Sequence, residues 1–178
     1  MSGHNKWSQI KRQKGTEDGT RRKLFGMLGK TISIEAKRAG GDRNLPGLRA
    51  AIEKARAANM PNENIDRAIK NATEKGNAEL LEVLYEAYGP GGVAILIEGI
   101  TDNNNRTSQE IRHLLAEHGG NLATPGSVTW AFQKINNLEW LAETKTEIGA
   151  EDREKINNLL EELEKHEDSK KVVTNLQN

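Results

Sequence analysis

Cationic side chains crowd the first 23 residues of the chain, where apolar residues are scarce. Lysine and arginine neutralise phosphates, so such a cluster favours binding to a polyanion, DNA or RNA. A tryptophan among them could stack on a base. The same residues also fit a solvated tail whose tryptophan packs against neighbouring helices, and both interpretations stay open. The candidate nucleic-acid-binding residues are Lys6, Trp7, Lys11, Arg12, Lys14, Arg21, Arg22 and Lys23.

The other motifs that could do chemistry are better explained as structural. The Gly-Pro-Gly-Gly stretch at residues 89–92 lacks the Lys-Ser/Thr pair of a phosphate-binding P-loop, which favours a turn. His113 and His118 are five residues apart, which places them on different helix faces rather than on one metal. The acidic residues near Glu161 and Glu164 are typical of a solvated helix face. We therefore expect no catalytic residue, no metal and no cofactor, and predict that the protein is not an enzyme.

Composition bounds the class of protein. The chain has 178 residues, 35% of them hydrophobic, and no cysteine, which excludes disulfides and thiolate metal sites. No apolar run reaches the roughly 18 residues of a membrane span, and the first residues lack a signal core, so we expect a cytoplasmic protein. The net charge is zero, but residues 1–76 hold 17 basic and 8 acidic residues, a net of +9, which leaves −9 for the remainder. This asymmetry predicts that the first half faces a polyanion.

Apolar periodicity predicts three short helices after a flexible arm of about residues 1–22. The first helix carries Leu24, Leu28 and Ile32 and ends before the two glycines at 40 and 41. A second begins near Pro46, and a third covers residues 65–72. Because their apolar faces are narrow, we expect a compact bundle that makes residues 1–76 a basic helical domain.

The most apolar stretch of the chain predicts the centre of a β-sheet. Residues 83–88 alternate in polarity and residues 93–97 form a continuous apolar run, as in two strands folded over the turn at residues 89–92. The second of these strands should be central, because a continuous apolar run indicates burial on both faces.

The remaining elements place this hairpin in an α+β domain of residues 77–178. Thr107 and Glu110 have the spacing of a capping box, which predicts the start of a helix. Residues 127–132 alternate as a strand would, with Trp130 and Phe132 on one face in the core. A weak strand at 143–148, a helix around residues 156–163 and a closing strand at 171–174 follow. The expected result is a sheet covered by two helices.

Five motifs, in order over residues 3–132, resemble the YebC/PmpR family, which includes the mitochondrial translational activator of cytochrome c oxidase. They are Gly3-His-Asn-Lys-Trp-Ser-Gln-Ile-Lys11, Ala57-Ala-Asn-Met-Pro-Asn-Glu-Asn-Ile-Asp-Arg-Ala-Ile-Lys70, Tyr85-Glu-Ala-Tyr-Gly-Pro-Gly-Gly-Val93, Thr101-Asp-Asn-Asn-Asn-Arg-Thr107 and His118-Gly-Gly-Asn121. The resemblance implies an N-terminal three-helix bundle followed by a ferredoxin-like α/β sandwich with a mostly antiparallel sheet. It also implies that the family's inserted third domain is missing near residues 133–142.

The resemblance and the charge pattern together predict a non-enzymatic, nucleic-acid-binding regulator of gene expression that contacts mainly phosphates. The family includes transcriptional regulators that bind DNA and ribosome-associated factors that assist translation, so the partner is DNA or ribosomal RNA. The alternative from another class is a protein-interaction module that docks through its acidic C-terminal half. An enzyme with a phosphate cradle at residues 89–92 is the third reading. No membrane and no small-molecule substrate are expected.

Overall fold

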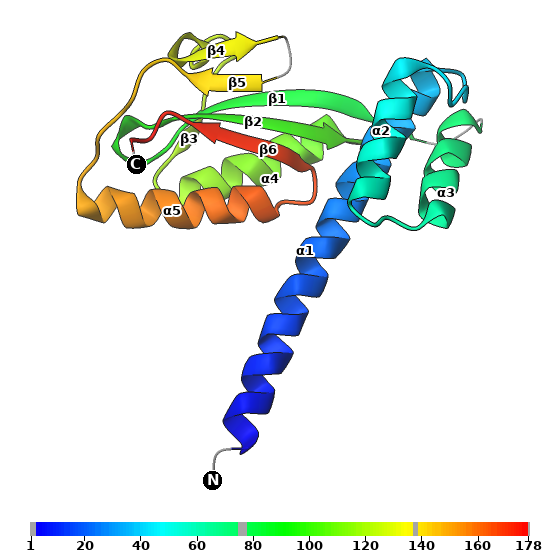
Figure 1. Cartoon of the computed structure of the whole chain (residues 1–178). Helices are drawn as coiled ribbons and strands as arrows, with labels where there is room; N and C mark the ends of the chain where they lie inside the picture. Colours follow the sequence, from blue (N-terminus) through cyan, green and yellow to red (C-terminus); the bar gives the residue numbers. More distant parts are fainter. Residues whose placement is uncertain (1–2, 75–77, 137–138, 178) are drawn as a thin grey trace. The chain divides into compact units, whose positions relative to one another are not determined.

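The computed structural model describes residues 3–74, 78–136 and 139–177, and for residues 3–16 it describes the backbone without the side chains. The chain divides into two compact units, Met1–Ala78 and Glu79–Asn178 (Figure 1). The first is helical and the second combines an antiparallel sheet with helices, so the α+β class predicted from the sequence is confirmed.

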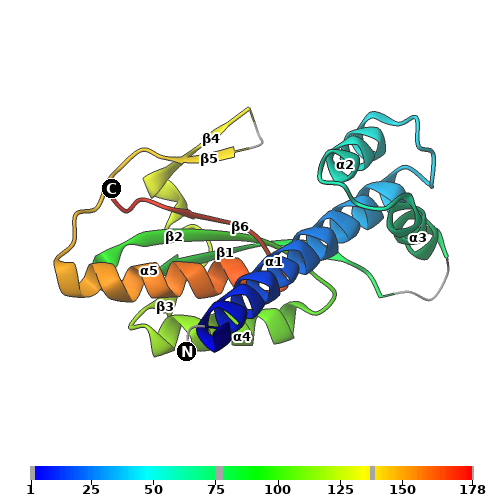
Figure 2. The same ribbon diagram turned by 60° about the horizontal axis from the view of Figure 1, so that its bottom comes forward.

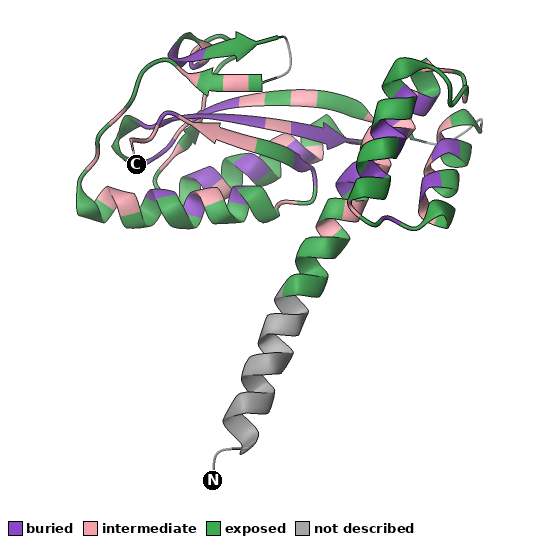
Figure 3. Ribbon diagram, in the orientation of Figure 1, coloured by how far each residue is buried: buried purple, intermediate pink, exposed green. Residues whose placement is uncertain are grey.

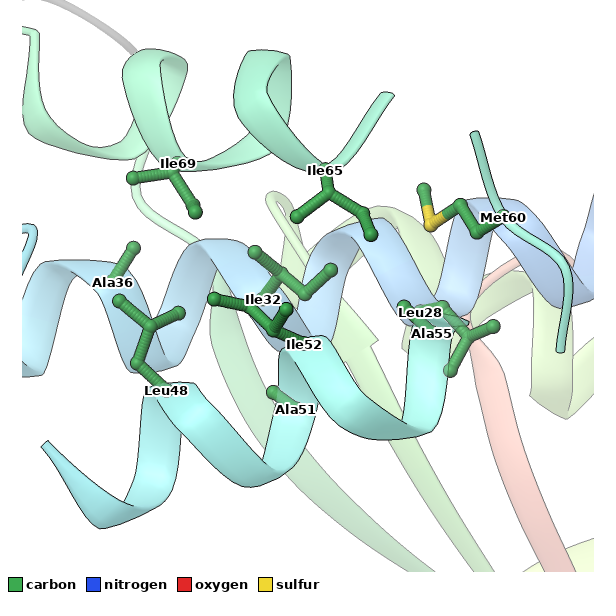
Figure 4. Packing of buried hydrophobic residues seen from close by; sticks show 10 residues of the cluster. All are labelled: Leu28, Ile32, Ala36, Leu48, Ala51, Ile52, Ala55, Met60, Ile65 and Ile69. Carbon is green, nitrogen blue, oxygen red and sulfur yellow. The ribbon is translucent and has the colours of Figure 1, made fainter. Parts of the chain in front are cut away.

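The first unit consists of helices α1 (Gly3–Arg38), α2 (Pro46–Ala57) and α3 (Asn62–Thr73). Pro46 stands at the first position of α2, where its missing N–H costs no hydrogen bond. The faces predicted to be apolar are the faces that pack together (Figure 4). Ile32 of α1, Leu48 of α2 and Ile65 of α3 are each at most 1% exposed. Full burial of one such side chain contributes about 1.5–3 kcal/mol, which holds three short helices together.

Helix α1 begins at Gly3, well before Leu24, where the apolar spacing predicted its start. Residues 1–22 were expected to form an arm because they show no apolar stripe, yet their backbone is helical from Gly3 onward. Lysine, arginine, glutamine and glutamate are good helix formers whether or not they are buried. Helix propensity can therefore extend α1 where the sequence shows no apolar stripe.

The second unit is organised around the hairpin of β1 (Leu81–Tyr88) and β2 (Ala94–Thr101). The strands pair antiparallel from Leu81↔Thr101 to Tyr88↔Ala94, as the sequence predicted. A short 3₁₀ turn, Pro90–Gly92, joins them. Gly91 there has φ +68°, and a Cβ at that position would lie 2.5 Å from Ile148 Cγ2. Residues 89–92 thus form a packed turn rather than an open phosphate loop.

The four-stranded sheet has the order β3-β1-β2-β6, with every pair antiparallel. Strand β3 is Asn121–Leu122 and β6 is Ser169–Thr174. Helices α4 (Asn104–Glu117) and α5 (Ala150–Lys165) lie together on one face (Figure 2). On the other face lie the 3₁₀ turn Thr129–Ala131 and a separate hairpin of β4 (Phe132–Ile135) and β5 (Glu139–Ala142).

Strand β2 is buried on both of its faces, as expected of a central strand (Figure 3). Ile95 and Ile97 point into the core formed with α4 and α5. Ala94 and Leu96 point the opposite way, into a core shared with Phe132. Unit 2 therefore has three layers with β2 in the middle one.

Two predicted strands are wrong. Residues 127–131 do not form a strand. Strand β4 begins only at Phe132, which is buried as predicted, whereas Trp130 is 61% exposed although the alternation placed it in the core. The cause is a long-range contact: the carboxylate of buried Glu86 accepts hydrogen bonds from the backbone of Gly126, Val128 and Thr129 at 2.6, 2.6 and 3.1 Å and holds them in a turn.

The weak strand expected at residues 143–148 is reduced to a single bridge, Thr146↔Leu176. There the side-chain amide of Asn175 donates to Thr146 Oγ1 at 3.0 Å, in place of a longer ladder. Helix α4 begins at Asn104 rather than near Thr107, because Asn103 caps it by accepting from the backbone N–H of Arg106 at 3.1 Å. The capping box predicted from Thr107 and Glu110 is also wrong.

Candidate nucleic-acid interface

All eight residues predicted to bind nucleic acid lie within helix α1. The side chains of Lys6, Trp7, Lys11, Arg12 and Lys14 lie outside the described residues. Arg21 and Arg22 are exposed and Lys23 is half-buried. A single helix thus carries the whole set, with the two arginines in the part of it whose side chains are described.

Arg21 and Arg22 differ from Arg38 and Arg43 in their electrostatic surroundings. Neither forms an ion pair with any residue that the structure describes. By contrast, Arg38 Nη1 lies 2.6 Å from Glu35 Oε1, and Arg43 Nη2 lies 2.7 Å from Asp66 Oδ1. The two α1 guanidinium groups are therefore available to an anionic ligand without the loss of an internal pair.

The outer faces of α2 and α3 add further exposed cations. Lys54 and Arg67 are exposed, and Arg49 and Lys70 make only long contacts, at 4.0 Å to Glu53 and 3.7 Å to Glu74. Exposed pairs of this kind contribute at most about 1 kcal/mol, so a phosphate could replace either carboxylate. The basic character of unit 1 is therefore distributed over all three helices.

A second polar cluster, in unit 2, escaped sequence reasoning. It surrounds Asp168, whose side chain is 1% exposed. Arg106 Nη2 and Thr107 Oγ1 both donate to Asp168 Oδ2, at 2.8 and 2.6 Å. Thr101 Oγ1 lies 2.8 Å from Thr107 Oγ1 and accepts from the backbone N–H of Asn103 at 2.9 Å. The carboxylate therefore ties the start of β6 to the first turn of α4.

This buried charge affects the groups around it. Burial raises the pKa of Tyr85, and the charge of Asp168 raises it further. The Tyr85 hydroxyl donates to Asn104 Oδ1 at 2.8 Å. The hydrogen bond to Asp168 raises the pKa of Arg106. Each shift favours the protonated form of its own group.

Three residues of this region, Glu110, His166 and Asp168, have possible metal-ligand atoms within 4.8 Å of one another. Their hydrogen bonds account for the arrangement. His166 Nδ1 accepts from the backbone N–H of Asp168 at 3.2 Å, so Nε2 carries the proton and donates to Glu110 Oε2 at 3.0 Å. The Arg106 guanidinium beside Asp168 would also repel a cation. The geometry fits a structural cluster better than a metal site.

The sequence offered little signal for this cluster. The polar loop that contains Thr107 is predicted as a turn and cap. Nothing in a single sequence pairs it with Asp168, which follows α5, 61 residues later in the chain. Of the other histidines, His118 closes α4 with Nδ1 2.9 Å from Leu114 O, and His113 lies 3.4 Å from Glu117 on the surface. These two are capping and solvated histidines, as predicted.

The part of the chain that the structure describes contains no helix that is both long and apolar enough to span a membrane.

Comparison with known sequences and structures identifies the family. The profile of the TACO1/YebC protein N-terminal domain matches residues 5–75, and that of the TACO1/YebC second and third domain matches residues 80–138. A crystal structure of the conserved hypothetical protein Aq1575 from Aquifex aeolicus has a TM-score of 0.79 at 32% identity, covering 88% of this chain and 90% of that one.

Curated relatives are named probable transcriptional regulatory proteins. The protein of Petrotoga mobilis is 46% identical over 173 residues, which cover 90% of this chain and 69% of the relative. That of Thermotoga petrophila is 48% identical over 164 residues, covering 85% and 65%. That of Thermoanaerobacter pseudethanolicus is 55% identical over 137 residues, covering 76% and 56%. The chain thus spans 56–69% of the length of these three curated relatives. On both profiles and identity it belongs to the TACO1/YebC family.

Proposed function

We propose that this chain is a nucleic-acid-binding regulator of gene expression that acts by binding and not by catalysis. The observation that carries the proposal is the pair Arg21 and Arg22, exposed on α1 without an ion pair among the described residues. Five further candidate residues, four of them cations, precede the pair on the same helix. The names of the relatives, probable transcriptional regulatory proteins, support a role in transcription.

Phosphates are the main contacts in this proposal. The seven cations among the candidates would each displace a counterion from the nucleic acid. At about 0.7–0.9 per contact, seven neutralised phosphates give a slope of log affinity against log salt of roughly −5 to −6. Contacts to phosphates position a protein without reading sequence, so modest sequence preference is expected.

We favour structured RNA, ribosomal RNA included, over a sequence-specific DNA operator. A helix that reads the major groove presents donors and acceptors to base edges and cations to the flanking phosphates. The exposed side of α3 instead carries Glu63 and Asp66 beside Arg67. Crosslinking in cells followed by sequencing decides: reads on large-subunit ribosomal RNA place the protein in translation, and reads at promoters place it in transcription.

The experiment that tests binding itself compares two charge-matched double variants of the full chain. Arg21→Gln/Arg22→Gln removes the pair on α1. Lys145→Gln/Lys170→Gln removes two exposed cations from unit 2. We expect the first variant to weaken binding to RNA or duplex DNA and to flatten the salt slope by roughly 1.5–2, while the second leaves both unchanged. Equal behaviour of the two variants contradicts the proposal.

The second candidate function, docking of the acidic half on a basic protein, has one supporting feature. Helix α5 exposes several carboxylates, among them Glu154, Glu162 and Glu164. Pull-down with and without nuclease separates the candidates, because partners held through nucleic acid are lost on digestion. Partners that resist nuclease favour protein docking.

We also propose that the extra length of the relatives is a domain inserted where this chain has its β4–β5 hairpin, near residues 133–142. The Petrotoga relative is the longer protein, since the match covers 90% of this chain but only 69% of the relative; the place of the extra residues is our proposal. Any activity that resides in that domain is not carried over to this chain. A regulator of this kind would act in the cytoplasm.

A further inference from the structure

The apolar side of α1 continues past the helices that cover it. Helix α1 has 36 residues and α2 and α3 have 12 each, which correspond to lengths of about 54 and 18 Å at 1.5 Å per residue. The exposure of the α1 side chains rises where the cover ends: Leu28 is 6% exposed, Phe25 is half-buried and Leu24 is 47% exposed.

A hollow of about 340 Å³ lies at this point. Five of its six lining residues come from consecutive turns of α1, and the sixth, Ala58, closes it from the end of α2. The five residues share one face of the helix, because each lies three or four positions from at least one other of them. Arg21, for example, lies four positions from Glu17 and three from Leu24. The lining residues are Glu17, Thr20, Arg21, Leu24, Phe25 and Ala58.

The lining combines an apolar floor with two opposite charges. Leu24, Phe25 and Ala58 offer a surface for a flat, weakly polar group, and a guanidinium such as that of Arg21 stacks well on π systems. The carboxylate of Glu17 repels phosphate but accepts hydrogen bonds from N–H groups. The hollow therefore suits a nucleobase, whose edge carries N–H donors. The guanidinium of Arg21 can stack on that base with its flat face and donate to an adjacent phosphate with its edge, and Arg22 and Lys23 lie outside the hollow for further phosphates.

We propose that this hollow binds an unpaired nucleobase, so that the preferred partner is a nucleic acid with single-stranded or looped segments. The inference rests on the proposed function and deepens it. A base within a duplex is stacked on both faces and cannot enter a pocket on a helix surface. The electropositive helix that carries the hollow supplies the phosphate contacts on either side of the inserted base.

A second copy of the chain is a less suitable occupant. A stable interface buries about 800 Å² on each partner. The hollow offers two large apolar side chains, while Thr20 and Arg21, which also line it, and Arg22 beside it are polar or cationic. Two copies of α1 brought together here would also set their guanidinium groups against each other.

The test uses a matched pair of variants that leave the charge unchanged. Leu24→Gln places an amide in the hollow. Leu45→Gln makes the same change at a leucine of unit 1 that is 45% exposed, against 47% for Leu24, and that does not line the hollow. The probes are a labelled oligoadenylate, the same strand paired with oligouridylate, and an abasic strand of equal length, all at one salt concentration.

We expect Leu24→Gln to weaken binding of the oligoadenylate about 5-fold or more, the lower end of what the loss of one base-stacking contact costs. Its affinities for the duplex and the abasic strand should stay unchanged, and Leu45→Gln should alter none of the three. Circular dichroism and thermal melts confirm that both variants are folded. An equal loss on all three probes, or no loss on any, overturns the proposal. So does sedimentation showing that the wild type is a dimer and Leu24→Gln a monomer.

Failure of the hollow and failure of the proposed function give different results. If Arg21→Gln/Arg22→Gln weakens binding while Leu24→Gln behaves like Leu45→Gln, the chain binds phosphates and the hollow holds no base. If the arginine variant binds every probe as the wild type does, the phosphate-binding role itself is refuted.

Discussion

A single carboxylate holds the loop that follows β3, and its removal is the sharpest test of the fold. Glu86 is 6% exposed on β1. Its Oε1 accepts from Gly126 N, and its Oε2 accepts from Val128 N and Thr129 N. In Glu86→Gln only one oxygen remains, and the new amide group must face a backbone N–H that it cannot accept from.

The expected cost follows from these three bonds. A hydrogen bond to a charged group contributes about 1.5–3 kcal/mol and a neutral one about 1 kcal/mol. Glu86→Gln loses one charged bond outright and converts two others to neutral bonds, a cost of about 2.5–7 kcal/mol. Burial of a neutral amide is cheaper than burial of a carboxylate, which offsets part of this. We therefore expect a net loss of about 2–3 kcal/mol, a large share of the roughly 5–15 kcal/mol that stabilises a typical domain.

Urea unfolding followed by tryptophan fluorescence measures this loss, since Trp130 and Trp140 both belong to unit 2. Glu82→Gln is the control, because Glu82 lies on the same strand and side of the sheet but is exposed. Its effect should stay within about 0.5 kcal/mol. Hydrogen exchange should also accelerate at the amides of Gly126 and Val128. The reasoning is refuted if Glu86→Gln is no less stable than the control.

Three other changes have defined outcomes. Gly99→Ala places a Cβ 2.6 Å from the backbone oxygen of Asp168 and should cost about 1–3 kcal/mol in the same unfolding assay. Asp168→Asn removes a buried charge from its half-exposed guanidinium partner and should cost about 1–3 kcal/mol in thermal unfolding, whereas Asp102→Asn, at an exposed pair, should cost less than about 1 kcal/mol; similar losses would contradict the assignment. In Tyr88→Phe, ultraviolet titration should show Tyr85 ionising above its ordinary pKa of 10.0, since burial favours the neutral phenol. The stability that Tyr85 contributes through this shift is present below pH 10 and is lost as the pH rises through the raised pKa, so a midpoint at or below 10 would contradict it.

Local patterns predicted the elements whose cause is local. The bundle follows from apolar residues at helical spacing, as at Leu48, Ile52 and Ile65, and the central strand follows from the run at residues 93–97. These apolar faces are buried by packing against one another, in the helical bundle and around the central strand. The extended start of α1 was not predicted, because helix propensity without an apolar stripe carries no signal in a periodicity argument.

What failed depends on contacts distant in sequence. The alternation around Trp130 looked like a strand, but the backbone there is held by hydrogen bonds to Glu86, 40 to 43 residues earlier in the chain. In the same way Thr107 looked like a cap, while its hydroxyl is committed to Asp168. Buried carboxylates that accept hydrogen bonds from residues distant in sequence determine the local structure at both positions. A single sequence does not reveal which residues will meet.

The double-sided burial of β2 constrains how unit 2 can come apart. Ile95 and Ile97 pack against α4 and α5, and Ala94 and Leu96 pack in the core on the β4–β5 side. Loss of either layer would expose one face of β2 to water, although the other layer still packs against that strand. The three layers should therefore unfold in one cooperative step. A mutation that destabilises the packing on one face of the sheet should also destabilise the packing on the opposite face.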